Sequence, residues 1–168
     1  IRTDAGDITI EMYANQAPLT VANFLRYVDE ARFEGASFYR VVRMDNQPDN
    51  DIKIEVIQGG IGFVESEARL EPIVHETTEK TGILHRDGVI SMARAEPGTA
   101  SSEFFICIND QPELDFKGRR NPDGQGFAAF GRVVHGMDVV RRIHAQPAEG
   151  QMLIAPVRIR AIERLKTE

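Results

Sequence analysis

Only one cysteine, Cys107, occurs in this chain of 168 residues. A disulfide within the chain and a metal site built from several cysteines are therefore excluded. No segment approaches the roughly 18 consecutive apolar residues of a transmembrane helix, so we expect no membrane span. Basic residues are outnumbered, with 20 Lys and Arg against 26 Asp and Glu and a net charge of −6. This balance argues against general nucleic-acid binding, which needs a basic surface.

Common catalytic and metal-binding patterns are missing as well. None of the four histidines has the spacing of a zinc ligand: His75, His85, His135 and His144. No serine lies in a Gly-x-Ser-x-Gly turn, and no Ser-His-Asp set is indicated. The acidic residues of the loop at 44–53 do not fit the EF-hand pattern, which favours a solvated loop. We therefore expect no metal and no cofactor.

The sequence does contain several short apolar segments of alternating polarity, which predict strands. They lie at residues 7–13, 38–42, 56–60, 88–93, 104–108, 127–134 and 155–162. Helices are predicted after Pro18, where Val21, Phe24, Leu25 and Val28 form one apolar face, and after Gly136. Many short strands with two helices favour a closed β-barrel capped by helices, and the length fits one domain over residues 1–168.

Arg40 is the unusual residue of the second predicted strand. A period of two places Phe38, Arg40 and Val42 on one face of it. Burying an unpaired guanidinium costs several kcal/mol, so Arg40 must pair, extend to solvent or serve a site. An arginine in an isolated strand most often extends to solvent. Cys107, in contrast, lies in the most apolar segment, which favours a small buried side chain over a nucleophile.

Seven short motifs change this interpretation of Arg40. They are Phe-Tyr-Arg-Val-Val at 38–42, Val-Ile-Gln-Gly-Gly at 56–60, Ser-Met-Ala-Arg at 91–94, Ser-Ser-Glu-Phe-Phe-Ile at 101–106, Leu-Asp at 114–115, Phe-Gly-Arg-Val at 130–133 and Gly-Met-Asp-Val-Val at 136–140. In type and order the set resembles the cyclophilin-type peptidyl-prolyl cis-trans isomerases, especially the bacterial members, over nearly the whole chain. The resemblance implies a mainly β fold, a closed eight-stranded antiparallel barrel capped by two α-helices.

The resemblance also implies an active site that needs no metal or cofactor. Arg40 matches the catalytic arginine, and Gln58 matches the glutamine that helps to hold it. Residues matching the proline pocket, its rim and the stretch that binds substrate backbone complete the expected substrate-binding set: Phe38, Val56, Ala93, Arg94, Glu103, Phe105, Leu114 and Phe127. The expected partners are proline-containing peptides and unfolded or flexible chains. We expect a monomer, and the likeness to periplasmic members and the missing initial Met favour the periplasm over the cytoplasm.

Three glutamates depart from the family pattern. Glu55 and Glu113 stand where aromatic residues are usual, and Glu103 replaces a glutamine. The missing tryptophan at position 113 argues against strong cyclosporin binding. If one of these carboxylates paired with Arg40, it would compete with substrate. The alternative function is then a module that binds proline-containing segments with little turnover, as a chaperone or scaffold. Period two places Glu55 on the opposite face from Val56 and Gln58, which favours the rim.

Overall fold

The computed structural model of this protein describes residues 1–166. These residues form ten strands, three α-helices and one 3-10 helix. In chain order they are β1 (Arg2–Thr3), β2 (Gly6–Asp7), β3 (Thr9–Met12), α1 (Pro18–Asp29), β4 (Ser37–Val42), β5 (Val56–Gly60), α2 (Thr78–Thr81), β6 (Val89–Met92), β7 (Phe104–Cys107), η1 (Pro112–Leu114), β8 (Ala128–His135), α3 (Met137–His144), β9 (Ala148–Glu149) and β10 (Met152–Ala161). Every segment predicted as a strand contains one, and the two predicted helices are present.

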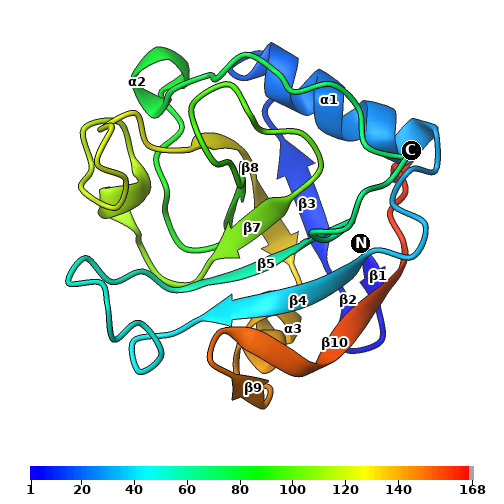
Figure 1. The fold of residues 1–168 in the computed structure, drawn as a ribbon. Coiled ribbons are helices and arrows are strands. Elements are labelled where there is room, and N and C mark those ends of the chain that lie inside the picture. Colours follow the sequence, from blue (N-terminus) through cyan, green and yellow to red (C-terminus); the bar gives the residue numbers. More distant parts are fainter. Residues whose placement is uncertain (167–168) are drawn as a thin grey trace.

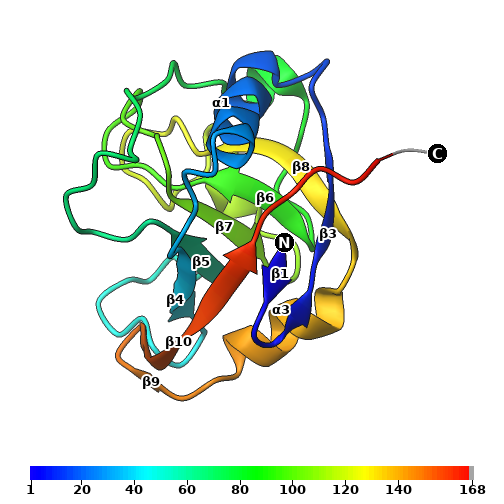
Figure 2. The ribbon, with the colours of Figure 1, turned by 90° about the vertical axis from the view of Figure 1, so that its right-hand side faces the viewer.

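The strands form one antiparallel sheet that curls into a barrel (Figures 1 and 2). Its order is β2-β1-β10-β4-β5-β7-β6-β8-β3, and β9 pairs with β10. Only Ile8 separates β2 from β3, and Ile8 exchanges backbone hydrogen bonds of 2.9 and 2.7 Å with Ile1. The two ends of the sheet therefore meet. The predicted barrel is confirmed; the strand count is higher than eight because β2 and β3 are split and β9 is a short addition.

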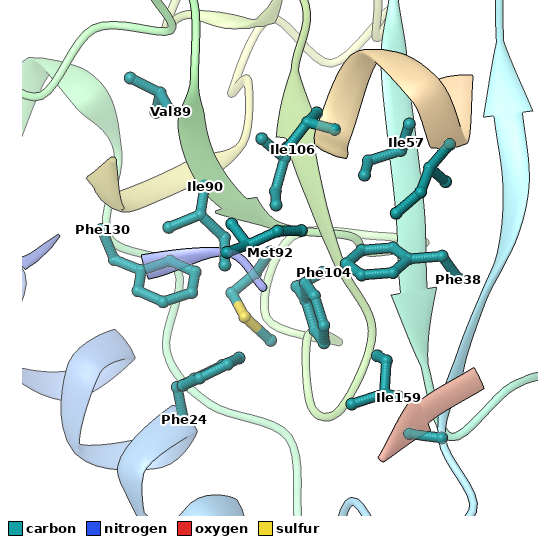
Figure 3. Packing of buried hydrophobic residues seen from close by; sticks show 14 of the residues in the cluster. Phe24, Phe38, Ile57, Val89, Ile90, Met92, Phe104, Ile106, Phe130 and Ile159 are labelled. Carbon is teal, nitrogen blue, oxygen red and sulfur yellow. The ribbon is translucent and has the colours of Figure 1, made fainter. Parts of the chain in front are cut away.

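The barrel interior is packed with large apolar side chains (Figure 3). Helices α1 and α3 lie at opposite ends of the barrel (Figures 1 and 2). Phe24 of α1 lies with its ring centroid 5.4 Å from those of both Phe104 and Phe130. Val140 and Ile143 of α3 are fully buried. Each helix thus closes one end of the barrel with its apolar face, as the spacing of its apolar residues predicts.

A bulge in β4 decides which side chains face the interior. Phe38 lies opposite Gly59 and Arg40 opposite Gln58, so Tyr39 is an extra residue in the ladder. Phe38 turns into the barrel and is fully buried, whereas Arg40 lines a cavity on the outer side. A side chain at position 59 would lie 2.8 Å from the Phe38 ring, which explains the glycine there. The prediction that Phe38 and Arg40 share a face is therefore wrong.

Two long loops flank the outer face of β5 and β7. Residues 43–55 connect β4 to β5, and residues 115–127 connect η1 to β8 (Figure 1). Arg120 of the second loop donates to Gln47 Oε1 at 2.8 Å and to the Ile52 carbonyl at 2.6 Å. These bonds hold the loops together over the barrel wall. Among residues 1–166, no helix has the length and apolarity needed to cross a membrane.

Candidate active site

A cavity of about 430 Å³ opens between the loops and the outer face of the barrel. Strands β4, β5 and β7, the 3-10 helix η1 and both long loops contribute to it, together with the segment after β5 and the loop between β6 and β7. Its walls are Arg40, Ile54, Val56, Gln58, Phe63, Ala93, Arg94, Ala95, Thr99, Ser101, Glu103, Phe105, Leu114, Arg120, Asn121 and Phe127. Every site residue predicted from the sequence is among them except Phe38. That prediction is corrected, because the bulge at Tyr39 turns Phe38 into the core.

One side of the cavity is apolar. Val56, Phe105 and Leu114 belong to a buried cluster separate from the barrel core, and Phe127 packs against it. The rings of Phe105 and Phe127 meet edge to face, with centroids 5.3 Å apart and an interplanar angle of 88°. Such an arrangement of two rings and two aliphatic side chains offers a concave surface for a small apolar ring.

The other side carries the guanidinium of Arg40, held by two glutamines. Nη1 donates to Gln58 Oε1 at 2.8 Å, while Nε and Nη2 donate to Gln151 Oε1 at 3.0 and 2.7 Å. Gln58 is held in turn by the Tyr39 hydroxyl, 3.0 Å from its Nε2. Gln151 donates to the carbonyl of Asn46 at 3.1 Å. Both amide oxygens therefore point at Arg40, and its orientation is fixed.

Arg40 keeps its full charge for a ligand. Among residues 1–166, no carboxylate lies within salt-bridge distance of it. Burial lowers the pKa of the guanidinium, but arginine starts so high that it stays protonated at neutral pH. The glutamines use three of its five N–H groups, and each Nη retains one without an acceptor in the described chain.

Glu103 lines the cavity but serves the protein itself. Its carboxylate accepts from the Tyr39 hydroxyl at 2.8 Å, the Ser102 hydroxyl at 2.6 Å and the Gly62 amide at 2.6 Å. Burial, reinforced by this neighbouring negative charge, raises the pKa of Tyr39, so Tyr39 remains a donor. Glu103 thus anchors the loop after β5 and does not bind Arg40.

The other two unusual glutamates also leave Arg40 free. Glu113 accepts from the backbone amide of Arg119 at 2.8 Å and pairs with its guanidinium, which lowers the pKa of the carboxyl. The half-buried Glu55 accepts a hydrogen bond of 3.4 Å from Asn109 Nδ2. Neither carboxylate lines the cavity. Competition of these acids with substrate for Arg40 has no structural basis.

Arg94 lines the cavity as a support for its rim. Its side chain is 1% exposed, and its two Nη atoms bind Asp123 at 2.9 and 3.0 Å. Nε and Nη2 also donate to the carbonyl of Gly126, and the guanidinium lies 5.1 Å from the Phe127 ring centroid. Arg94 thereby holds residues 115–127 in place and supports Phe127. Its hydrogen-bonding capacity is largely used within the chain.

Gln151 and Arg120 were missed by sequence reasoning. Gln151 lies just after the short strand β9 and accepts hydrogen bonds from Arg40, which is more than one hundred residues away in sequence. No motif surrounds it. Arg120 lies in a loop whose glycines, Pro and Asp predict only irregular structure. The only available signal was the polar amide of Gln151 just before the apolar alternation of β10.

Behind the apolar wall lies a Ser–His–Asp array that sequence spacing did not indicate. His85 Nδ1 donates to Asp115 at 2.7 Å, and its Nε2 accepts from the Ser91 hydroxyl at 2.8 Å. The imidazole stacks on Phe105, with centroids 6.0 Å apart and an angle of 13°. His85 and Ser91 are 1% and 0% exposed, so no substrate reaches the hydroxyl. The array supports the Phe105 wall and is not a nucleophilic site.

His85 should make stability depend on pH. Burial lowers the pKa of His85 below its ordinary value of 6.5 despite the opposing charge of Asp115. As the pH falls below about 6.5, His85 of the unfolded chain binds a proton, whereas His85 of the folded chain does not. The free energy of unfolding therefore decreases by up to about 1.4 kcal/mol per pH unit. Urea unfolding of wild type and His85→Gln between about pH 7.5 and about pH 5.5 measures this slope.

The exposed residue His135 provides the control. The slope below about pH 6.5 should be shallower in His85→Gln and unchanged in His135→Gln. Equal slopes in all three proteins would show that His85 titrates normally in the folded state.

Comparisons with known proteins agree on one family. The family model "Cyclophilin type peptidyl-prolyl cis-trans isomerase/CLD" matches residues 1–164. Peptidyl-prolyl cis-trans isomerase cyp18 of Streptomyces antibioticus is 36% identical over 147 residues, which cover 85% of this chain and 80% of that protein. Peptidyl-prolyl cis-trans isomerase B of Escherichia coli K12 is 37% identical over 145 residues, covering 84% and 80%.

A solved structure matches the fold over nearly its full length. The cyclophilin type peptidyl-prolyl cis-trans isomerase of Cryptosporidium parvum, crystallised in the presence of the dipeptide Ala-Pro, superposes with a TM-score of 0.78. The match covers 99% of this chain and 98% of that one, at 22% sequence identity. The similarity supports the barrel architecture.

Proposed function

Because this chain belongs to the cyclophilin-type peptidyl-prolyl cis-trans isomerases, we propose that Arg40 is its catalytic residue and that the outer cavity binds the proline. The chain is an isomerase of Xaa-Pro peptide bonds. The observation that carries the assignment of Arg40 is its fixed guanidinium, which faces an apolar recess and is bonded only to neutral groups.

The chemistry follows from the electronic structure of the amide. Resonance of the nitrogen lone pair gives the C–N bond partial double-bond character, with a barrier of about 20 kcal/mol. A donor to the prolyl nitrogen localises the lone pair and weakens this resonance. The nitrogen accepts best when the bond is twisted, so an Arg40 N–H stabilises the transition state more than the ground state. No nucleophile or proton transfer is needed.

The apolar wall completes the mechanism. Val56, Phe105, Leu114 and Phe127 would hold the proline ring while the preceding residue turns. Exclusion of water around the ring strengthens the hydrogen bond from Arg40. The substrates are then proline-containing segments of peptides and of unfolded or flexible chains, whose slow isomerisation delays folding. This mechanism uses no group from a second copy, and we propose that the protein acts as a monomer.

The alternative is a module that binds proline segments with little turnover. It would keep the apolar wall but would not require a free guanidinium. A carboxylate bonded to Arg40 would favour this alternative, and Glu55, Glu103 and Glu113 all lie elsewhere. The position of these acids therefore favours the enzyme.

Replacement of Gln151 tests the proposal through Arg40. In a protease-coupled assay on an Xaa-Pro peptide, wild type should accelerate isomerisation, and Gln151→Leu should lower kcat/KM about 10-fold because the guanidinium loses two hydrogen bonds. Gln151→Glu should lower it further, since a carboxylate there would neutralise Arg40. Gln16 is exposed on the surface, and Gln16→Leu and Gln16→Glu are the matched controls.

Two results would contradict the proposal. Full activity of Gln151→Glu would show that the charge of Arg40 does not matter. A wild-type protein that binds the peptide, followed by a spectroscopic titration, yet leaves its isomerisation rate unchanged would favour the binding module.

A further inference from the structure

A second arginine, Arg120, lines the same cavity and has no part in the mechanism above. It lies in the loop 115–127, beside Asn121, and both residues border the recess that contains Arg40. We propose that this corner of the cavity selects substrates with an acidic residue next to the proline, and that Arg120 binds its carboxylate. The inference rests on the proposed function, because it concerns the substrates of the same site.

The corner contains donors that lack acceptors. The only hydrogen bonds of the Arg120 guanidinium in the described chain come from Nη1, to Gln47 and to the Ile52 carbonyl. Nε and Nη2 are left over. Asn121 Nδ2 is buried and likewise has no partner in residues 1–166. Buried donors are nearly always satisfied in folded proteins, so the unsatisfied Asn121 amide beside a cavity suggests a ligand that accepts.

The charges that line the cavity also favour an anionic ligand. Arg40 and Arg120 both make hydrogen bonds to neutral groups only, and neither forms an ion pair within residues 1–166. Arg94 is paired with Asp123, and Glu103 accepts from the Tyr39 hydroxyl and the Gly62 amide. Both cations line the same cavity, and burial together with the charge of Arg40 lowers the pKa of Arg120. A carboxylate would relieve their repulsion.

Arg120 is also rigidly placed. Gln47, 3% exposed, accepts from Arg120 and from the Ile54 amide through one oxygen. Its Nε2 donates to the carbonyls of Arg43 and Ile54 at 2.6 and 2.8 Å. The loop 43–55 therefore fixes Arg120 before substrate arrives. A preorganised guanidinium loses little entropy on binding, which suits it to select between substrates.

The test compares glutamate with its neutral isostere. Four peptides with blocked ends carry Glu or Gln immediately before or immediately after proline, and exchange NMR measures kcat/KM for each. Blocked ends exclude the carboxylate of a chain terminus as the group recognised. For at least one position the Glu/Gln ratio of wild type should be about 10, the discrimination expected of a charge-assisted hydrogen bond, and added salt should lower it.

Substitutions in the loop assign the preference to Arg120. The ratio should fall to about 1 in Arg120→Gln and stay well above 1 in Arg120→Lys, which keeps the charge. Arg119→Gln removes the same charge from the next residue, whose side chain is 72% exposed and paired with Glu113, and should keep the wild-type ratio. Because the readout is a ratio, a general loss of activity in a variant does not affect it.

The outcomes separate this inference from the proposed function. A wild-type ratio near 1 at both positions overturns the inference while turnover of the Gln peptides still supports the enzyme. A ratio that survives in Arg120→Gln overturns the assignment to Arg120. If no peptide is turned over, the proposed function fails, and the same four peptides measured for Kd by NMR titration decide the inference alone.

Discussion

Arg40→Ala should lower kcat/KM for an Xaa-Pro peptide by about 10²–10³-fold, the range found when one preorganised donor to a transition state is removed. The whole acceleration required to bring prolyl exchange to milliseconds is about 10⁴-fold, or roughly 5.4 kcal/mol. Two glutamines hold the Arg40 guanidinium, and each of its Nη atoms keeps one N–H group free for substrate. Within residues 1–166, no other charged donor of the cavity has a free N–H group on both Nη atoms. The loss of Arg40 should therefore remove most of the catalysis.

The loss should fall on turnover more than on binding. The apolar wall remains in Arg40→Ala, so peptide affinity should change little while kcat falls. Arg40→Lys should be intermediate, because an ammonium cannot bond both Gln58 and Gln151 and still reach the substrate in the same geometry. Arg141, exposed and paired with Asp87, supplies the control Arg141→Ala, which should behave as wild type.

The assignment would be refuted if Arg40→Ala kept more than about a third of wild-type activity, since one preorganised donor is worth far more than that. A large rise in KM with unchanged kcat would also contradict it. Such a change would assign Arg40 to uniform binding of ground state and transition state alike, and not to catalysis.

The apolar part of the site was predictable because its residues come from short ordered motifs. Val56, Phe105, Leu114 and Phe127 each lie in or beside a segment whose alternation or motif was clear. Neighbouring strands then bring them together: β5 pairs with β7, with Gln58 opposite Phe105. Local sequence fixes such positions once the order of the strands is known.

Phe38 shows where local reasoning failed. Period-two alternation assumes a regular ladder, and the bulge at Tyr39 adds one residue to it. The bulge reverses the facing of every residue before it relative to those after it. It therefore sends Phe38 inward while Arg40 points outward, and the sequence carries no separate signal for it.

Long-range polar contacts were the second failure. Gln151 reaches Arg40, and Arg120 reaches Gln47, from loops that are distant in sequence. Tertiary contacts likewise determine whether a glutamate forms an ion pair with Arg40. Glu103 instead binds the Gly62 amide. Two residues earlier, a side chain at Gly60 would lie 2.7 Å from that carboxylate. Such pairings depend on how loops fold back over the barrel, and composition and spacing do not encode that.

Phe104→Ala should destabilise the protein by about 3–5 kcal/mol, the usual cost of removing a buried phenylalanine. Phe104 is fully buried, and its ring lies 5.4, 5.7 and 5.8 Å from those of Phe24, Phe33 and Phe38, all near perpendicular. Removing it opens a cavity where β4, β7 and α1 meet, and the edge-to-face contacts are lost with it (Figure 3). Equilibrium unfolding in urea, monitored by circular dichroism, measures the change.

Phe105, the next residue, is the comparison, because adjacent residues of β7 face opposite sides of the barrel wall. Phe105→Ala should cost less stability, since its ring borders the open cavity and contacts Phe127 and His85 instead of the core aromatics. It should nevertheless raise KM strongly, whereas Phe104→Ala, assayed at low temperature where it remains folded, should keep much of its activity. Equal stability losses, or equal activity losses, in the two variants would show that the wall between core and site is not where the structure places it.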